Sequence, residues 1–272
     1  MQQIRIPKSS LLRQVINFLF YCEFEEGDTS GEWLSIFPNV TTNMIICLEN
    51  KMEFPKGYQD TGVSISCTTI ANMRIVSKLR FVQVQFKPFG IHAFKGTPMS
   101  DLVNSMLDLE FLFKPSECER IKDRLSSAGN ISDMFHYLEI FLEKRLKAVE
   151  IDKRLPISIE LLNQNHISLD AVSEEVCLTS RGFRKLFTSQ VGLSPGYYKK
   201  IARFNAAASQ ISTNPDVSLT TIAVENGYYD QSHFIRDFRQ FAGISPKVYQ
   251  KFLAKSSDFY NYRSSSPHRF EE

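Results

Sequence analysis

Short apolar segments alternate with turn-forming residues through the first third of the chain. Four segments rich in β-branched and aromatic residues are predicted strands, at 33–37, 44–48, 63–67 and 81–86. Pro, Gly, Asn and Asp separate them, as in tight turns. Several short strands at this spacing indicate a small β-sheet or barrel. The apolar segment 15–22 has no small-residue cleavage site after it, so we expect a buried element there rather than a signal peptide.

The period of the apolar positions changes after Pro98. Residues 100–112 show a partly helical pattern, and 116–127 is a predicted helix. Ser116 stands at its start and Glu119 follows three residues later, which is the spacing of a capping box. Helices therefore follow the strands in this half of the chain.

A longer amphipathic helix is predicted over residues 132–150. Its apolar positions recur every three or four residues and form one stripe: Phe135, Leu138, Phe141, Leu142, Leu146 and Val149. This stripe fits both an internal core and a dimer seam, and we favour internal packing. Pro156 then starts another helical element over 157–163, and we place a domain boundary near 150–165.

The last third of the chain contains an internal repeat. Gly-Leu-Ser-Pro at 192–195 returns as Gly-Ile-Ser-Pro at 243–246, a shift of 51 residues. The same shift carries Phe183 onto Phe234. Each copy has the pattern of a helix, a tight turn, a second helix and a stop, so one small unit is built twice. Two neighbouring helix-turn-helix units predict a grip on two turns of DNA.

In the first copy, Ser168 caps a short helix, and Cys177 is expected as a buried turn residue. Thr179 or Ser180 caps the second helix. The apolar side of that helix comprises Phe183, Leu186 and Phe187. Its outward side comprises Ser180, Arg181, Arg184 and Lys185. In such a motif the N-terminal part of the second helix faces base edges in the major groove, where Arg and Lys reach guanine.

The second copy follows the same logic. Gly227 supplies a left-handed turn conformation, and Asp230 caps the following helix. The buried side of that helix comprises Phe234, Phe238 and Phe241. Its outward, base-facing side comprises Gln231, Ser232, His233 and Arg236. Gln can contact adenine with two hydrogen bonds, and Arg can contact guanine.

One helix is predicted between the two units, over 195–211, with Pro195 in its first turn. At about 1.5 Å per residue it is roughly 26 Å long, which approaches the roughly 34 Å between successive major-groove faces. It can thus hold two recognition helices in neighbouring grooves. The residues expected at the DNA backbone are Lys199, Lys200, Arg203 and Arg239.

Composition changes this picture little. The chain has 272 residues, of which 43% are hydrophobic and 23% charged, as in an ordinary globular protein of two domains. Residues 163–272 hold 13 Lys and Arg against 10 Asp and Glu, whereas residues 1–162 hold 19 against 20. The small basic excess thus lies with the repeat.

The five cysteines are scattered and form no Cys-x-x-Cys pair. This favours reduced thiols and a cytoplasmic location. No apolar run approaches the roughly 18 residues that a membrane-spanning helix needs, so we expect no membrane partner. The polar stretch 256–272 is expected to be a disordered tail.

Residues 163–255 resemble the DNA-binding domain of AraC/XylS-type transcriptional regulators. The two Ser-Pro stops, the turn from Ala223 to Tyr228, and the segment Gln-Ser-His-Phe at 231–234 carry the resemblance. It implies an all-α double helix-turn-helix domain that binds double-stranded DNA. It also implies base contacts by Arg181, Arg184 and Lys185 in the first unit and by Gln231, Ser232 and Arg236 in the second.

Residues 1–155 are more distantly similar to the cupin-like sensor domains that precede such DNA-binding domains. The segments Arg-Ile-Pro at 5–7, Phe-Pro-Asn at 37–39 and 84–90 carry this similarity. The expected class is therefore α+β with two domains, a sheet or barrel followed by helices and then the helical repeat. The resemblance implies a small-molecule effector of unknown identity, a homodimer, and RNA polymerase as partner of an activator, the commoner role in the family.

Two other function classes fit the chain less well. A cupin-type enzyme needs closely spaced metal ligands, but His92, His136, His166, His233 and His268 are far apart and lie outside the predicted strands. No nucleophile elbow, phosphate-binding loop or His-Glu-x-x-His motif is present. We therefore predict no enzyme, no cofactor and no metal site. The second alternative is a non-catalytic interaction module with the stripe at 135–149 as its seam.

Overall fold

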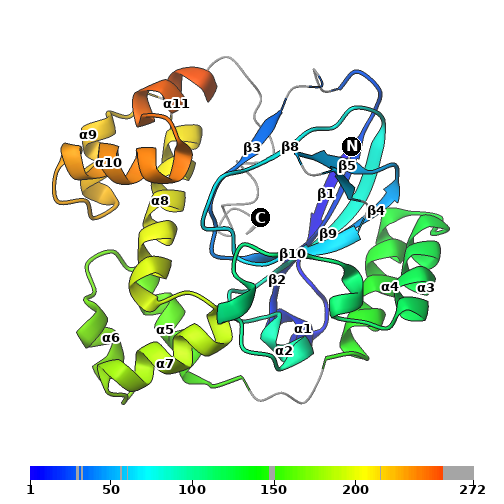
Figure 1. The fold of residues 1–272 in the computed structure, drawn as a ribbon, viewed down its shortest axis with the longest axis horizontal. Helices are drawn as coiled ribbons and strands as arrows, with labels where there is room; N and C mark the ends of the chain where they lie inside the picture. The colour runs from blue at the N-terminus through cyan, green and yellow to red at the C-terminus, as the bar shows by residue number, and fades with distance from the viewer. Residues whose placement is uncertain are drawn as a thin grey trace. The chain divides into compact units, whose positions relative to one another are not determined.

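The computed structural model describes residues 1–28, 31, 33–55, 57–59, 61–146, 151–214 and 216–253. The chain divides into two compact units (Figure 1). Unit 1 comprises Met1–Leu34, Thr41–Ser66 and Asn72–Ile151. Unit 2 comprises Ser35–Val40, Cys67–Ala71 and the chain from Asp152 onward. The α+β class with a strand-rich part followed by helices is confirmed. The predicted tail at 256–272 lies outside the described residues.

An antiparallel sheet of six strands forms the frame of unit 1, in the order β1-β2-β9-β4-β7-β10. The strands are β1 Gln2–Arg5, β2 Ile16–Phe24, β4 Thr42–Glu49, β7 Thr61–Ser64, β9 Leu79–Phe86 and β10 Met106–Leu107. The predicted strands at 44–48 and 81–86 are the long central strands β4 and β9, and the buried element expected at 15–22 is the third long strand, β2. The segment 63–67 is a strand only to Ser64.

Two short sheets of two strands each accompany the large one. In one, β3 Leu34–Ile36 pairs with β8 Ala71–Met73, so the predicted strand at 33–37 is shorter than expected. In the other, β5 Met52–Phe54 pairs with β6 Gly57–Gln59. Sequence patterning missed β5, β6 and β8 because each offers only three residues for a period of two.

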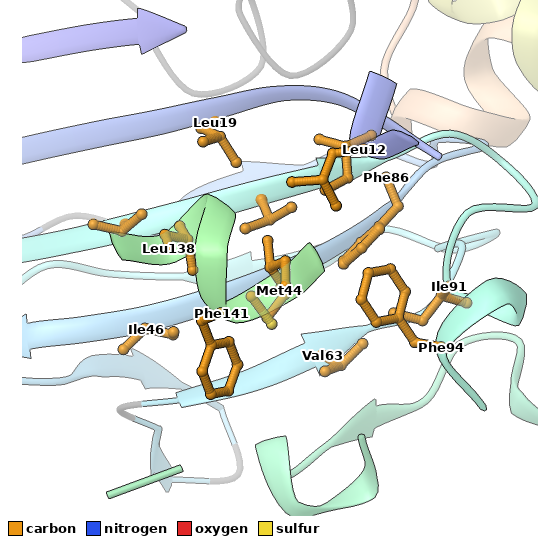
Figure 2. Close-up of a cluster of buried hydrophobic side chains, with 14 of the residues drawn as sticks. Leu12, Leu19, Met44, Ile46, Val63, Phe86, Ile91, Phe94, Leu138 and Phe141 are labelled. Atoms are coloured by element: carbon orange, nitrogen blue, oxygen red, sulfur yellow. The ribbon is translucent and has the colours of Figure 1, made fainter. Parts of the chain in front are cut away.

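One face of the large sheet encloses the core of unit 1. Successive side chains of a strand point to opposite faces, so Val82 and Val84 of β9 share this face. The helix α4, Ile131–Glu143, lays Leu138 and Phe141 beside Met44 of β4 (Figure 2). The helix α3, Pro115–Ser126, adds further buried leucine and isoleucine side chains.

The apolar stripe on α4 is an internal core and not a free seam. Phe135, Leu138 and Leu142 are fully buried, and Phe141 is 8% exposed. The helix ends at Glu143, earlier than the predicted 150, and Val149 lies outside the described residues. The Arg145 guanidinium donates to the Phe141 carbonyl, one of the carbonyls that the helix end leaves without an intrahelical partner.

The start of α3 differs from the predicted capping box. Lys114 is the cap residue and Pro115 the first helical residue, where a missing N–H costs little. The N–H of Lys114 donates to Glu117 Oε2 at 3.1 Å. Glu117 therefore fills the role expected of Glu119, and Ser116 already lies inside the helix.

The remaining helical elements of unit 1 are short. They are α1 Ser10–Arg13, α2 His92–Lys95, and the 3-10 turns η1 Ser100–Leu102 and η2 Leu109–Phe111. The two 3-10 turns and β10 together occupy the segment 100–112, which was predicted to be only partly helical.

The second face of the sheet carries buried amides among aromatic rings. Gln83 of β9 donates to Asn43 Oδ1 of β4 at 2.8 Å, and both residues are buried. On the same face, the rings of Phe20 and Phe81 meet edge to face with centroids 6.0 Å apart. Because a buried amide without a partner is costly, the paired amides specify how β4 and β9 align.

The described residues of unit 2 form mainly helices, seven in number. They are α5 Arg154–Asn163, α6 Leu169–Glu175, α7 Ser180–Val191, α8 Pro195–Thr213, α9 Leu219–Glu225, α10 Gln231–Ala242 and α11 Pro246–Leu253. The helix α5 starts two residues before Pro156, where it was predicted to begin. A proline is tolerated there because the first four N–H groups of a helix have no intrahelical acceptor.

Two segments from the first half of the chain complete the core of unit 2. The ring of Phe37 meets Phe204 of α8 and Tyr249 of α11 edge to face, with centroids 6.1 and 5.5 Å apart. The amide of Asn205, which is buried, donates to the carbonyl of Pro38 at 2.8 Å. The helical unit therefore includes residues that precede it by more than a hundred positions.

Replacing Leu138 by Ala tests the packing of α4 on the sheet. The substitution leaves a cavity at a fully buried site, so we expect unit 1 to lose about 2–5 kcal/mol of its free energy of unfolding. Urea unfolding followed by circular dichroism measures the loss. Ile140→Ala, on the same helix but 36% exposed, is the control with a loss of about 1 kcal/mol. Equal losses for the two variants would contradict the packing.

Candidate nucleic-acid interface

The first helix-turn-helix corner consists of α6 and α7. Ser168 Oγ accepts from the N–H of Ala171, and Thr179 Oγ1 accepts from the N–H of Gly182, each at 3.1 Å. Each helix thus begins at a capped residue. Of the two caps considered for α7, the structure selects Thr179.

Aromatic side chains fix the inner side of α7. Phe183 and Phe187 are buried. The ring of Phe187 packs edge to face on the ring of Tyr198 of α8, with the ring centroids 5.3 Å apart. Leu186 is partly buried beside them. Because these residues occupy one side of the helix, the residues between them must point outward.

The outward side of α7 carries three cations. Arg181, Arg184 and Lys185 are all exposed, as predicted from their spacing. Ser180 is exposed too, but its hydroxyl donates to Asp170 Oδ1 on α6 at 3.1 Å. The three cations are therefore available to a ligand, while Ser180 is held by the neighbouring helix.

The turn of the first corner is strained. Cys177 has φ +53°, a left-handed conformation that costs a residue with a Cβ about 1–2 kcal/mol. The residue is also exposed, which corrects the expectation of a buried turn cysteine. A turn at the surface requires a left-handed backbone conformation but no small buried side chain. The position of Cys177 in the repeat therefore indicates its backbone conformation and does not indicate burial of its side chain.

The second corner consists of α9 and α10, and its turn is relaxed. Gly227 has φ +70°, which glycine adopts at little cost. Asp230 Oδ1 accepts from the N–H of His233 at 2.7 Å and caps α10, as predicted. Phe234, Phe238 and Phe241 are buried, and the ring centroids of Phe238 and of Phe204 on α8 lie 5.1 Å apart.

The outward side of α10 carries Gln231, Ser232, Arg236 and Arg239, all exposed. His233 differs from the base-facing role expected of it. Its Nε2 lies 3.4 Å from Asp237 Oδ2, so the ring is turned back along the helix toward a buried carboxylate. This geometry favours an internal role for His233.

The linker helix α8 joins the corners, and both corners pack on it (Figure 1). Of its three predicted backbone contacts, only Lys200 is exposed. The ammonium of Lys199 donates to the carbonyl of Ile167, and burial, with the charge of Arg203 nearby, lowers the pKa of Lys199. Arg203 forms an ion pair with Asp237. Lys199 and Arg203 are thus both engaged within unit 2.

Sequence reasoning missed two features of this surface. Tyr229, directly before the cap of α10, is 92% exposed. An aromatic residue next to a recognition-helix cap is a signal that could have been noticed. Asp237 was missed because a single charge among three phenylalanines has no partner that is visible in the local sequence.

Within the described part of the chain, no group of three or more His, Cys, Asp or Glu residues is placed to hold a metal ion. Across the same residues, the structure contains no helix with both the length and the apolarity needed to cross a membrane. Two capped corners on one linker helix define the fold of unit 2 as a double helix-turn-helix.

Comparisons with known proteins agree with this fold. Residues 172–251 match the family described as "Helix-turn-helix domain", and residues 4–108 match "Domain of unknown function (DUF6597)". An "Uncharacterized HTH-type transcriptional regulator" of Haemophilus influenzae is 27% identical over 159 residues, which cover 57% of this chain and 53% of that protein. The chain thus spans about half the length of this relative.

Further similarities have the same character. The HTH-type transcriptional regulator YfiF of Bacillus subtilis is 22% identical over 225 residues, covering 74% of this chain and 69% of that protein. Among solved structures, ToxT from Vibrio cholerae superposes with a TM-score of 0.48 at 11% identity, covering 93% of this chain and 98% of that one. The chain therefore contains an AraC-type helix-turn-helix domain at residues 172–251, and the two relatives named here are called HTH-type transcriptional regulators.

Gly227→Ala tests the geometry of the second turn. The added Cβ would lie 2.7 Å from the Asn165 Cβ, and the alanine would have to adopt a left-handed backbone conformation. We expect unit 2 to lose about 1–3 kcal/mol of its free energy of unfolding. Thermal unfolding measures this loss.

Gly196→Ala is the matched control in the same unit. An added Cβ there meets Leu169 at an ordinary 3.4 Å in the first turn of α8. We expect stabilisation of up to about 1 kcal/mol, because Ala favours helix over Gly. Equal changes in the free energy of unfolding for Gly227→Ala and Gly196→Ala would mean that the stability of unit 2 does not require a glycine in the left-handed turn.

Proposed function

We propose that unit 2 binds double-stranded DNA sequence-specifically, with α7 and α10 in two neighbouring major grooves, and thereby regulates transcription. The observation that carries this proposal is the pair of capped helices, each with a buried aromatic side and an exposed cationic or amide side, on one linker helix. The 19 residues of α8 are about 28 Å long at 1.5 Å per residue. Together with the radii of the flanking helices, this length fits the roughly 34 Å between successive groove faces.

The residues divide into two roles in this proposal. Arg181, Arg184 and Lys185 contact bases from α7, and Gln231, Ser232 and Arg236 contact bases from α10, because they are exposed near the helix starts. Lys200 and Arg239 contact phosphates. Phosphate contacts fix the register of a protein on DNA but carry no sequence information.

Unit 1 is the sensor of an effector in this proposal. The second face of its sheet combines aromatic rings with the buried amides Asn43 and Gln83. A mostly apolar surface with a few polar groups is the usual composition of a small-molecule site. The proposed division is a sensor at 1–155 and a DNA-binding domain at 163–255. Activation together with RNA polymerase, a homodimer and a cytoplasmic location belong to the same proposal.

Sequencing of the DNA fragments that the purified full chain selects from genomic DNA tests the proposal directly. We expect a motif in two parts whose centres lie about one helical turn, or 10–10.5 base pairs, apart. Footprinting on the selected motif should protect both major grooves on one side of the duplex. Recovery of fragments without a common motif would contradict sequence-specific binding.

Alanine substitutions separate base contacts from phosphate contacts. Arg184→Ala and Arg236→Ala should each weaken binding to the selected motif by about 1–3 kcal/mol and relax the preference at one base position. Lys200→Ala should weaken binding to all sequences alike and lower the slope of log affinity against log salt by about 0.9. Fluorescence anisotropy at several salt concentrations measures both effects.

Arg120→Ala is the matched control for these variants. It removes the same charge from an exposed position on α3 of unit 1. We expect unchanged base preference and an unchanged salt slope. A uniform loss of affinity on every sequence for Arg184→Ala and Arg236→Ala would contradict the division into two roles.

A further inference from the structure

Arg203 of α8 lies at the junction of three parts of the second corner. Its guanidinium donates to Asp237 Oδ2 of α10 at 2.8 Å and to the carbonyl of Gly227 in the turn at 3.3 Å. The same group stacks over the ring of Tyr228, 4.3 Å from the centroid. One side chain thus joins the linker helix, the turn and the recognition helix.

The ion pair is withdrawn from solvent. The side chain of Arg203 is 13% exposed and that of Asp237 is 7% exposed. A carboxylate at such a site needs its counter-charge, since an unpaired buried charge is strongly unfavourable. A phosphate could engage Arg203 only by drawing it away from Asp237, so the guanidinium is poorly suited to anchor DNA.

The position of Asp237 on α10 determines what the ion pair controls. Asp237 directly follows Arg236, so their side chains point about 100° apart around the helix axis. Ser232 lies four residues before Arg236 and therefore on the same outward side. Fixing Asp237 to α8 fixes the rotation of α10 about its own axis, and with it the direction of Arg236 and Ser232.

Among the residues that the structure describes, the first corner shows no such ion pair at the corresponding place. The repeat shift of 51 residues maps Asp237 onto Leu186, which is partly buried and apolar. The two recognition helices are therefore held differently, α7 by apolar packing at this position and α10 by a charge.

We propose that Arg203 and Asp237 are positioning residues that set the base preference of α10 alone. The inference rests on the proposed DNA binding and deepens it. Neither side chain contacts DNA in this arrangement. Loss of the pair should let α10 rotate. The protein should then no longer distinguish the selected bases from other bases in the half of the motif next to α10, but should still distinguish them in the half next to α7.

Asp237→Asn in the full chain is the decisive variant because it keeps the shape of the side chain and removes its charge. Three duplexes are compared by fluorescence anisotropy: the selected motif, a version altered in the α7 half and a version altered in the α10 half. We expect discrimination at the α10 half to fall about tenfold and discrimination at the α7 half to stay unchanged. Thermal unfolding of the same preparation verifies that the variant is folded.

The double variant Arg203→Gln with Asp237→Asn addresses the phosphate alternative. It removes one positive and one negative charge and leaves two amides that can bond to each other. A phosphate contact by Arg203 would lower the salt slope by about 0.9, as expected for Lys200→Ala. If Arg203 only positions α10, the double variant keeps the slope of log affinity against log salt. It then loses as much discrimination at the α10 half of the motif as Asp237→Asn does.

Several results would overturn the inference while the proposed function stands. For Asp237→Asn, they are unchanged discrimination at both halves of the motif, loss of discrimination at both halves together, and tighter binding to all three duplexes with unchanged discrimination. For the double variant, the contradicting result is a lowered slope of log affinity against log salt. If the wild-type chain itself shows no base preference, the proposed function fails and the inference fails with it.

Discussion

The orientation of both recognition helices depends on the burial of aromatic rings against α8. Phe187 packs on Tyr198, and Phe238 packs on Phe204, so each recognition helix has one side that must face the linker helix. Each buried ring contributes about 1.5–3 kcal/mol relative to an exposed one. The cationic and amide side chains are outward because the rings are inward. The candidate interface is therefore a consequence of core packing rather than a separate feature of the surface.

The sequence predicted well those features that depend on local spacing. The caps Ser168 and Asp230, the glycine turn at 227 and the exposed cations of α7 follow from periods of three and four residues and from capping chemistry. Two of the three long strands of unit 1, β4 and β9, followed from runs of β-branched and aromatic residues, and the third, β2, was expected only as a buried element. In each of these cases the residues that cause the structure are neighbours in the chain.

Features that depend on distant partners were not predictable from the sequence. Arg203 was expected at DNA, but its guanidinium is bound to Asp237, which is 34 residues away in the chain. Lys199 is engaged by a carbonyl 32 residues away. A long cationic side chain can lie inward or outward with the same helical spacing.

Phe37 and Pro38 have a consequence for how this architecture can be recombined. The slot that Phe37 fills is lined by Phe204 of the linker helix α8 and by Tyr249 of the last helix, α11. A hybrid protein that joins the first half of one regulator to the last third of another would inherit the slot from one parent and its filler from the other. Exchange of the last third between relatives is thus restricted by the shape of a loop that lies far upstream in the chain.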